Sequence, residues 1–153
     1  MWRKLLSTPH DVAIFVIRVA LGGMIWAHGA QKFLGWFGGH GWSGTLQFFE
    51  RALHIPTPLA ALAILTEFFG MAALVLGLFG RVFAAGAATI MVVAVATIHH
   101  RFGFYMNWYT DPGRGEGFEL HFLALAMAVA IMIRGSGAWS IDRLLVRDRT
   151  QRP

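Results

Sequence analysis

Two ionisable residues, Arg18 and Glu67, interrupt long apolar segments of the sequence. A charge at the centre of a lipid bilayer costs at least ~2.5–3.5 kcal/mol, so each of them needs a partner or a function. Arg18 lies nine residues after Pro9, and Glu67 lies thirteen residues before Gly80. In helices that start at Pro9 and Gly80 their depths differ by about 6 Å, which an arginine side chain spans. The sequence therefore predicts an intramembrane ion pair between Arg18 and Glu67, which either locks two helices together or serves the function.

A second group of polar residues gathers where the apolar segments end. It consists of His28, Gln31, Lys32, His99, His100 and Glu119. Such a group can bind an anion, hydrogen-bond the carbonyl oxygens of a quinone, or relay protons. His28 and Lys32 share one helix face with Arg18, within about 80°. Together with Glu67, the group forms the predicted substrate or quinone pocket, in which no residue is assigned a catalytic role.

Helical geometry limits which of these side chains face one another. His99 and His100 point about 100° apart, so only one of them faces the helix bundle fully. Glu119 and His121 point about 200° apart, and Glu119 is the one expected to face inward. The alternative for any single histidine is that it only hydrogen-bonds a loop carbonyl, and Lys32 can simply extend to the membrane interface.

Metal and haem chemistry fit this pattern less well than a quinone. No HxxxH or ExxH spacing occurs, and the adjacent pair His99 and His100 is not a helical ligand spacing, so no metal site is predicted. Haem b would need His28 opposite a second histidine, and this arrangement is not expected. The chain has no cysteine, which excludes disulfides and iron–sulfur clusters ligated by this chain.

Helices that cross a membrane are needed to position these residues. Hydrophobic residues make up 56% of the chain and charged residues 14%, whereas about a quarter of the residues in soluble domains are charged. Apolar segments of ~20 residues can span the hydrocarbon region as helices. The sequence predicts an all-α, integral membrane four-helix bundle that forms a single domain over residues 1–153. The expected spans are residues 9–34, 59–79, 82–101 and 118–133, and residues 139–153 form a basic cytoplasmic tail.

Lysine and arginine residues are distributed unequally between the two ends of the predicted spans. Eight lie on the side of the chain termini and four on the other side, while Arg18 lies within the membrane. The positive-inside rule therefore places both termini in the cytoplasm. The net charge of +5 is assigned to contacts with the anionic headgroups of a lipid membrane. Nucleic acid is excluded as a partner because the sequence has no basic stripe with interleaved aromatic residues.

Three segments of the sequence resemble the motifs of one protein family. They are HGAQKFLG with the following FGG at residues 28–39, EFFG with the following LGL at residues 67–78, and GSGAWSID at residues 135–142. Over about residues 10–142 the chain is similar to the DoxX family of bacterial membrane proteins. The resemblance implies a four-helix, multi-pass protein of the bacterial inner (plasma) membrane.

The resemblance also implies a link to redox chemistry. Some members of the family are small membrane subunits of thiosulfate:quinone oxidoreductase or of a quinol oxidase, and others act beside soluble redox enzymes. The matching positions here are His28, Gln31, Lys32 and Glu67. We therefore predict a redox-associated membrane subunit that interacts with a quinone. A non-catalytic scaffold for a soluble redox partner protein and a small transporter or channel are the alternatives, and the sequence leaves open a homo-oligomer and oxidoreductase activity of the chain itself.

Overall fold

The computed structural model describes residues 5–148, and these residues form helices and no β-strand. The elements are α2 (Val12–Leu34), η1 (Trp36–Gly38), α3 (Gly41–Arg51), α4 (Thr57–Leu65), η2 (Thr66–Gly70), α5 (Met71–Leu76), α6 (Gly80–Thr97), η3 (His99–Phe102), α7 (Glu119–Arg134) and α8 (Ile141–Asp148). The segment η2 is a π-helix that joins α4 to α5. The last residues of the predicted basic tail, 149–153, lie outside the described residues.

Three helical segments in the described part of the chain are long and apolar enough to cross a membrane. They are Val12–Leu34, Thr57–Leu76 and Gly80–Thr97, of which the second combines α4, η2 and α5. The fourth expected span corresponds to α7, which has 16 residues and a length of about 24 Å. The prediction of an all-helical membrane chain is therefore confirmed, and three of its helices have the length and composition of spans.

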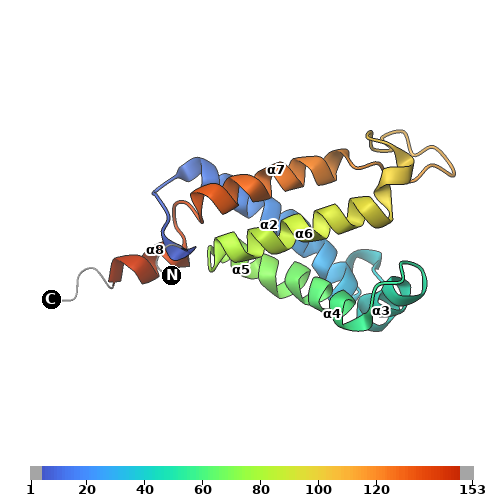
Figure 1. The fold of residues 1–153 in the computed structure, drawn as a ribbon, viewed down its shortest axis with the longest axis horizontal. Helices are drawn as coiled ribbons and strands as arrows, with labels where there is room; N and C mark the ends of the chain where they lie inside the picture. The colour runs from blue at the N-terminus through green and yellow to red at the C-terminus, as the bar shows by residue number, and fades with distance from the viewer. Residues whose placement is uncertain (1–4, 149–153) are drawn as a thin grey trace.

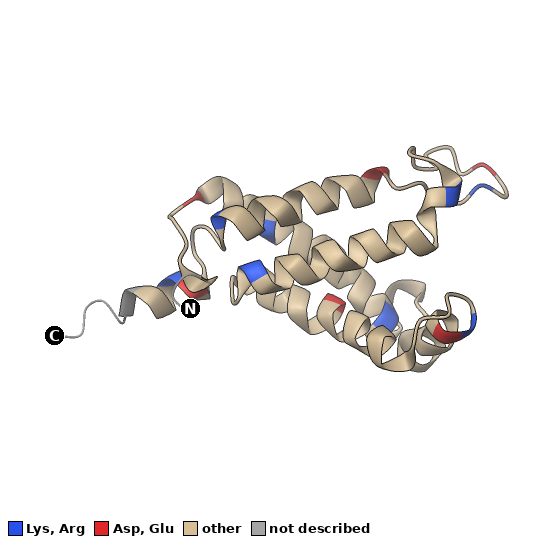
Figure 2. Cartoon of the chain, viewed as in Figure 1, with Lys and Arg blue, Asp and Glu red and all other residues tan. Residues whose placement is uncertain are grey.

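The long helices lie side by side (Figure 1). α6 packs along α7, and α2 packs against α5, η2 and α7. The start of α2 and α8 lie at one end of the molecule, which we call the α8 end, and α3 and the loop of residues 103–118 lie at the other, which we call the α3 end. Figure 2 shows that charged residues are sparse along the middle of the helices. The buried apolar core includes Leu21, Ile25, Met71, Leu74, Ala84, Ala87, Ala124, Ala128 and Ile131.

The segment between α7 and α8, residues 135–140, closes the α8 end of the helices, and we call it the closing segment. Most of it is buried. It leads into Asp142, whose carboxylate accepts hydrogen bonds from the backbone N–H groups of Phe79 at 2.8 Å and Gly80 at 3.0 Å. These N–H groups begin α6 and have no partner within the helix, so a carboxylate stabilises them. Ser136 donates a further hydrogen bond to Asp142, which fixes the closing segment against the start of α6.

Candidate functional site

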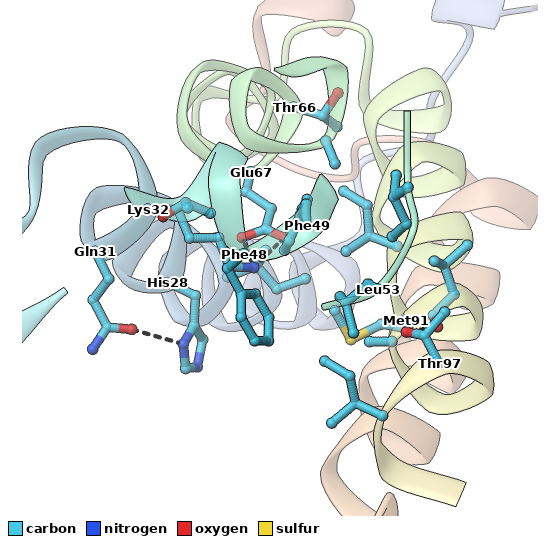
Figure 3. Close-up of a pocket in the computed structure, with 18 of the residues that line it drawn as sticks. His28, Gln31, Lys32, Phe48, Phe49, Leu53, Thr66, Glu67, Met91 and Thr97 are labelled. Atoms are coloured by element: carbon cyan, nitrogen blue, oxygen red, sulfur yellow. Dashed lines mark hydrogen bonds and ion pairs between the residues drawn. The ribbon is translucent and has the colours of Figure 1, made fainter. Parts of the chain in front are cut away.

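An ion pair between Lys32 and Glu67 lies between α2 and the π-helix η2 (Figure 3). The Nζ atom of Lys32 lies 2.6 Å from both carboxylate oxygens of Glu67. The Glu67 side chain is 2% exposed and that of Lys32 is 30% exposed, so the carboxylate is enclosed while the ammonium group keeps one side open. Lys32 also lies 5.9 Å from the ring centroid of Phe49, where a cation is attracted by the aromatic face.

A glycine one turn before Lys32 allows this pair to form. A Cβ atom on Gly29 would lie 2.5 Å from the backbone carbonyl carbon and oxygen of Glu67. Only glycine fits this contact, because the obstructing atoms belong to the backbone of η2 and cannot rotate away. Gly22 makes a similar approach to Val75 seven residues earlier on the same face of α2. The two glycines therefore bring α2 against the second span closely enough for Lys32 to reach Glu67.

These contacts correct the predicted ion pair between Arg18 and Glu67. Arg18 is fully buried, but its Nη2 atom donates to the backbone carbonyls of Ala138 at 3.5 Å and Trp139 at 3.2 Å in the closing segment. The backbone carbonyls of the closing segment therefore supply acceptors that the buried guanidinium requires. Glu67 instead pairs with Lys32, and Arg18 binds the closing segment at the α8 end of the molecule.

A cavity of about 1040 Å³ lies beside the ion pair, toward the α3 end. Its walls come from α2, α3, α4, η2, α6 and the start of α7, and they are mainly apolar. The charged and amide side chains and the histidines of the lining come from several elements. They are His28, Gln31, Lys32, His40, His54, Glu67, His99, Glu116 and His121. Five of the residues predicted for the pocket therefore line one cavity, in which the polar residues around Lys32 adjoin mainly apolar walls.

The hydrogen bonds of two cavity histidines define which ring nitrogen carries the proton. The Nδ1 atom of His99 lies 2.8 Å from the backbone carbonyl of Glu116, and a carbonyl only accepts, so Nδ1 donates. Gln31 donates its amide nitrogen to the carbonyl of Phe37 at 3.3 Å, so its amide oxygen faces Nδ1 of His28 at 3.1 Å. In the neutral ring, the Nε2 atoms of His28 and His99 are therefore hydrogen-bond acceptors.

His121 is a cavity residue that the sequence prediction left out. Its ring lies 4.1 Å from that of His99, measured between centroids, and its buried Nδ1 atom has no hydrogen-bond partner. Helical geometry allowed only one of His121 and Glu119 to face inward, and Glu119 was expected there. The loop before α7 decides between the two residues, because the backbone N–H of Met106 and the indole N–H of Trp108 donate to Glu119 and hold it outside the cavity.

Glu119 and His100 lie outside the cavity, which corrects their assignment to the pocket. The Glu119 carboxylate accepts from the backbone N–H of Met106 at 3.3 Å and from the indole N–H of Trp108 at 3.4 Å. His100 is exposed, and its Nδ1 atom contacts the carbonyl of Val95 at 3.2 Å. Both residues therefore bind nearby polar groups, and for His100 this is the alternative role that the sequence allowed for a histidine.

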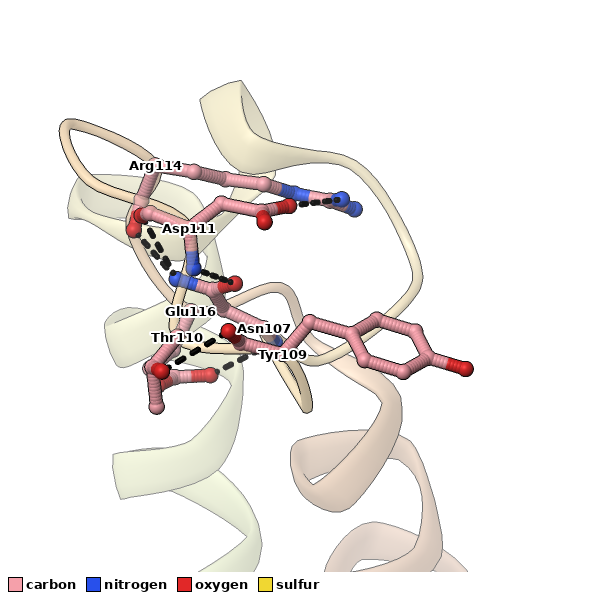
Figure 4. Close-up of polar contacts among 6 residues, drawn as sticks. All are labelled: Asn107, Tyr109, Thr110, Asp111, Arg114 and Glu116. Carbon is pink, nitrogen blue, oxygen red and sulfur yellow. Dashed lines mark hydrogen bonds and ion pairs between the residues drawn. The ribbon is translucent and has the colours of Figure 1, made fainter.

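The loop of residues 103–118 is held together by polar contacts around Asn107 (Figure 4). The amide of Asn107 donates to the carbonyls of Asp111 at 3.2 Å and Arg114 at 2.8 Å. Its backbone N–H donates to the carboxylate of Glu116 at 2.8 Å. Glu116 lines the cavity and its carbonyl accepts from His99, so the order of this loop fixes one wall of the site.

Together these features define a class of protein: an all-helical, multi-pass membrane protein with an ion pair beside a mainly apolar cavity. Within residues 5–148, no group of three or more histidine, aspartate or glutamate side chains is arranged to hold a metal ion. The profile of the DoxX family matches residues 13–100, and the chain belongs to this family. Membership suggests a membrane-associated, redox-related protein. No curated protein and no solved structure matches the chain.

Proposed function

We propose that the protein is a redox-associated subunit of the bacterial inner membrane that binds a quinone in this cavity. The observation that carries the proposal is the lining itself, in which Lys32, His28 and His121 contribute polar groups to a cavity whose walls are mainly apolar. Ligand pockets combine a large apolar wall with a few convergent polar groups in this way. A quinone matches both regions, because its carbonyl oxygens accept hydrogen bonds and the rest of the molecule is apolar.

The proposal includes a bundle of four transmembrane helices. α7 packs along α6, and together with the residues just before it, it approaches the ~30 Å thickness of the hydrocarbon region. Four spans place α8 and the start of α2 on the same side of the membrane. The excess of lysine and arginine on that side supports a cytoplasmic position for both termini, so that the α3 end and the cavity belong to the outer half of the membrane.

The polar residues present fit a quinone headgroup. The Nδ1 atom of His121 is buried without a partner, and such atoms are rare in folded proteins unless a ligand or water satisfies them. Lys32 has a third N–H available beyond the two that point to Glu67, and its exposed side faces the cavity. A ligand with two oxygen atoms can therefore hydrogen-bond both Lys32 on α2 and His121 on α7.

The same residues are suited to exchange protons with such a ligand. When bound, a quinone supplies two-electron, two-proton carrier chemistry. The Nε2 atoms of His28 and His99 are acceptors in the neutral ring, so they can accept hydrogen bonds from hydroxyl groups. Lys32 donates to carbonyl oxygens, and Glu67 holds the ammonium group in place. The apolar walls limit access of water to these contacts, which strengthens them.

The cavity supports binding more strongly than transport. It ends beside η2, and beyond it toward the α8 end lies the buried core around Leu21, Met71 and Ile131. Arg18 and the closing segment then occupy the α8 end. A scaffold function predicts instead that α8 docks a soluble redox enzyme, and deletion of residues 143–153 should abolish capture of that enzyme without altering ligand binding.

Extraction of bound molecules from the purified protein tests the proposal. Wild-type protein is purified in a mild detergent, and its organic extract is analysed by mass spectrometry for quinone. We expect quinone in a fixed ratio to protein, about a tenfold lower ratio for His121→Leu, and wild-type retention for the control Glu119→Gln, because Glu119 lies outside the cavity. A visible spectrum of the same sample detects any haem. Absence of quinone from wild type in several mild detergents and in nanodiscs would refute the proposal.

A further inference from the structure

The facing surfaces of α4 and α6 are apolar but do not pack against each other. On α6 the cavity is lined by Gly86, Thr89, Ile90, Val93, Ala94 and Thr97. This spacing describes one continuous helix face. On the opposite wall Leu59, Leu62, Ala63 and Thr66 describe an equivalent face of the second span. Two helix faces of the kind that normally pack together therefore enclose an open space.

A crossing point next to the ion pair explains why the two faces separate. A Cβ atom on Gly86 would lie 2.9 Å from Cγ2 of Thr66, and one on Gly70 would lie 2.7 Å from the ring of Phe83. α6 thus contacts the π-helix η2 closely. From there α4 and α6 diverge toward the α3 end (Figure 1). The space between them is a wedge whose narrow end lies at η2, and we call it the α4–α6 groove.

The α4–α6 groove opens sideways from the helices. Leu59 and Leu62 are 58% and 60% exposed, and Val93 is 41% exposed. Eleven residues separate Gly86 from Thr97, which gives the groove a length of about 17 Å along α6. It is continuous with the polar region beside Lys32, because both line the same cavity. At this depth in a membrane, its open side faces lipid chains rather than water.

We propose that the α4–α6 groove holds the isoprenoid chain of the quinone, and that the ligand enters and leaves the site sideways through it. This inference rests on the proposed function, because the headgroup must bind beside Lys32 for its chain to extend along α6. The volume supports it: about 1040 Å³ is at the upper limit of the 300–1,000 Å³ typical of pockets for whole drug-sized ligands. A headgroup alone leaves the apolar region empty, and an isoprenoid chain fills it with matching chemistry.

The test compares two quinones that differ only in their chains. Wild-type protein in nanodiscs is titrated with a dimethoxy-methyl-benzoquinone that has no chain and with the same headgroup carrying a ten-carbon chain. The variant Ala94→Phe places a ring in the groove, and Ala96→Phe is its matched control, because Ala96 is exposed and outside the cavity lining. The ratio of the two affinities is compared among the variants, so that partition of the chain into lipid cancels.

We expect Ala94→Phe to weaken binding of the chain-bearing quinone about tenfold and to change binding of the headgroup alone less than about twofold. Ala96→Phe should leave both affinities unchanged. Leu62→Trp fills the groove from the opposite wall at a largely exposed position and should repeat the effect of Ala94→Phe. Gel filtration and circular dichroism confirm that each variant is folded, and the exposed position of Leu62 keeps the test informative if Ala94→Phe does not fold.

Three results would overturn the inference. Equal weakening of both quinones, or of neither, by the groove variants would show that the chain lies elsewhere. Retention of a phospholipid that only the groove variants lose would assign the groove to an acyl chain. A change of oligomeric state in the groove variants would assign it to a second copy of the protein. Failure of wild type to bind either quinone is a different outcome, because it refutes the proposed function itself.

Discussion

The ion pair between Lys32 and Glu67 should contribute strongly to stability, and a double-mutant cycle can measure it. At 2.6 Å two unit charges attract each other by about 6 kcal/mol at an effective dielectric constant of ~20, before the cost of desolvation is subtracted. Removal of one partner from a buried pair costs about 3–5 kcal/mol, because the other charge stays buried without compensation. Lys32→Met leaves the carboxylate of Glu67 enclosed, so we expect a loss of about 3 kcal/mol.

The reverse change should cost less. In Glu67→Gln the ammonium group of Lys32 can turn into the cavity, because its side chain is 30% exposed, and we expect a loss of about 1–2 kcal/mol. The double variant removes both charges, so it should lose about as much as Glu67→Gln alone. The coupling energy is then about 3 kcal/mol, which is the loss expected for Lys32→Met alone. The measurement is reversible unfolding in mixed micelles with increasing denaturing detergent, followed by circular dichroism.

A second cycle with Arg18 provides the control. Arg18 binds the closing segment and shares no hydrogen-bond partner with Glu67, so Arg18→Met and Glu67→Gln should be additive within about 0.5 kcal/mol. Coupling between Arg18 and Glu67 above about 1 kcal/mol, or coupling between Lys32 and Glu67 below about 0.5 kcal/mol, would show that the carboxylate pairs with the arginine instead.

Three further substitutions test the contacts that position the site. Gly29→Val drives a side chain into the backbone of η2 and should lower stability by about 3 kcal/mol or more and reduce quinone retention, whereas Gly23→Val meets open space and should unfold like wild type. Asp142→Ala removes the carboxylate that binds the start of α6 and should cost about 2 kcal/mol in the same unfolding assay. The pKa of Asp11 lies below its ordinary value of 3.8, mainly because its carboxylate accepts the backbone N–H of Ile14. Its stabilising contribution is complete above pH 3.8 and is lost as the pH falls through the lowered pKa, so the difference in unfolding temperature between wild type and Asp11→Asn should shrink in that range.

The positions of the long helices could be predicted from the sequence because hydropathy acts locally. Each apolar segment is a continuous run of residues, and its length alone indicates whether it can cross a membrane. The expected spans at residues 9–34, 59–79, 82–101 and 118–133 each overlap one of the long helical segments, with ends that differ by a few residues. Details of the turns were less predictable: α6 begins at Gly80 because Asp142, far along the chain, binds its first N–H groups.

The partner of Arg18 could not be predicted because it is set by residues far away in the sequence. Counting from the helix ends gave similar depths for Arg18 and Glu67, but depth does not define which side chains face each other. The carbonyl groups that Arg18 contacts belong to residues 138 and 139, in a segment whose folded path no local pattern indicates. A charge deep in a helix therefore predicts that a partner exists without identifying it.

The cavity could not be predicted from the sequence either, because a helix face that packs tightly and one that lines a cavity show the same spacing of apolar residues. Small and β-branched residues at helical spacing on α6 are typical of a tightly packed face. The structure separates that face from α4 because Gly86 and Gly70 bring α6 against the π-helix at a single crossing point. A π-helix inserts an extra residue into a helical turn and is frequently found at functional sites.

The π-helix links the two halves of the proposed site. On one side its backbone contacts Gly29, which brings Lys32 to Glu67, and on the other side Thr66 contacts Gly86, from which the groove widens. The ion pair lies at the narrow end of the α4–α6 groove, because the ion pair and the crossing point of α6 both involve the five residues of η2. A ligand whose polar group reaches Lys32 can extend its apolar part between α4 and α6. This geometry favours a membrane-soluble molecule with a polar head and an apolar chain over a small hydrophilic substrate.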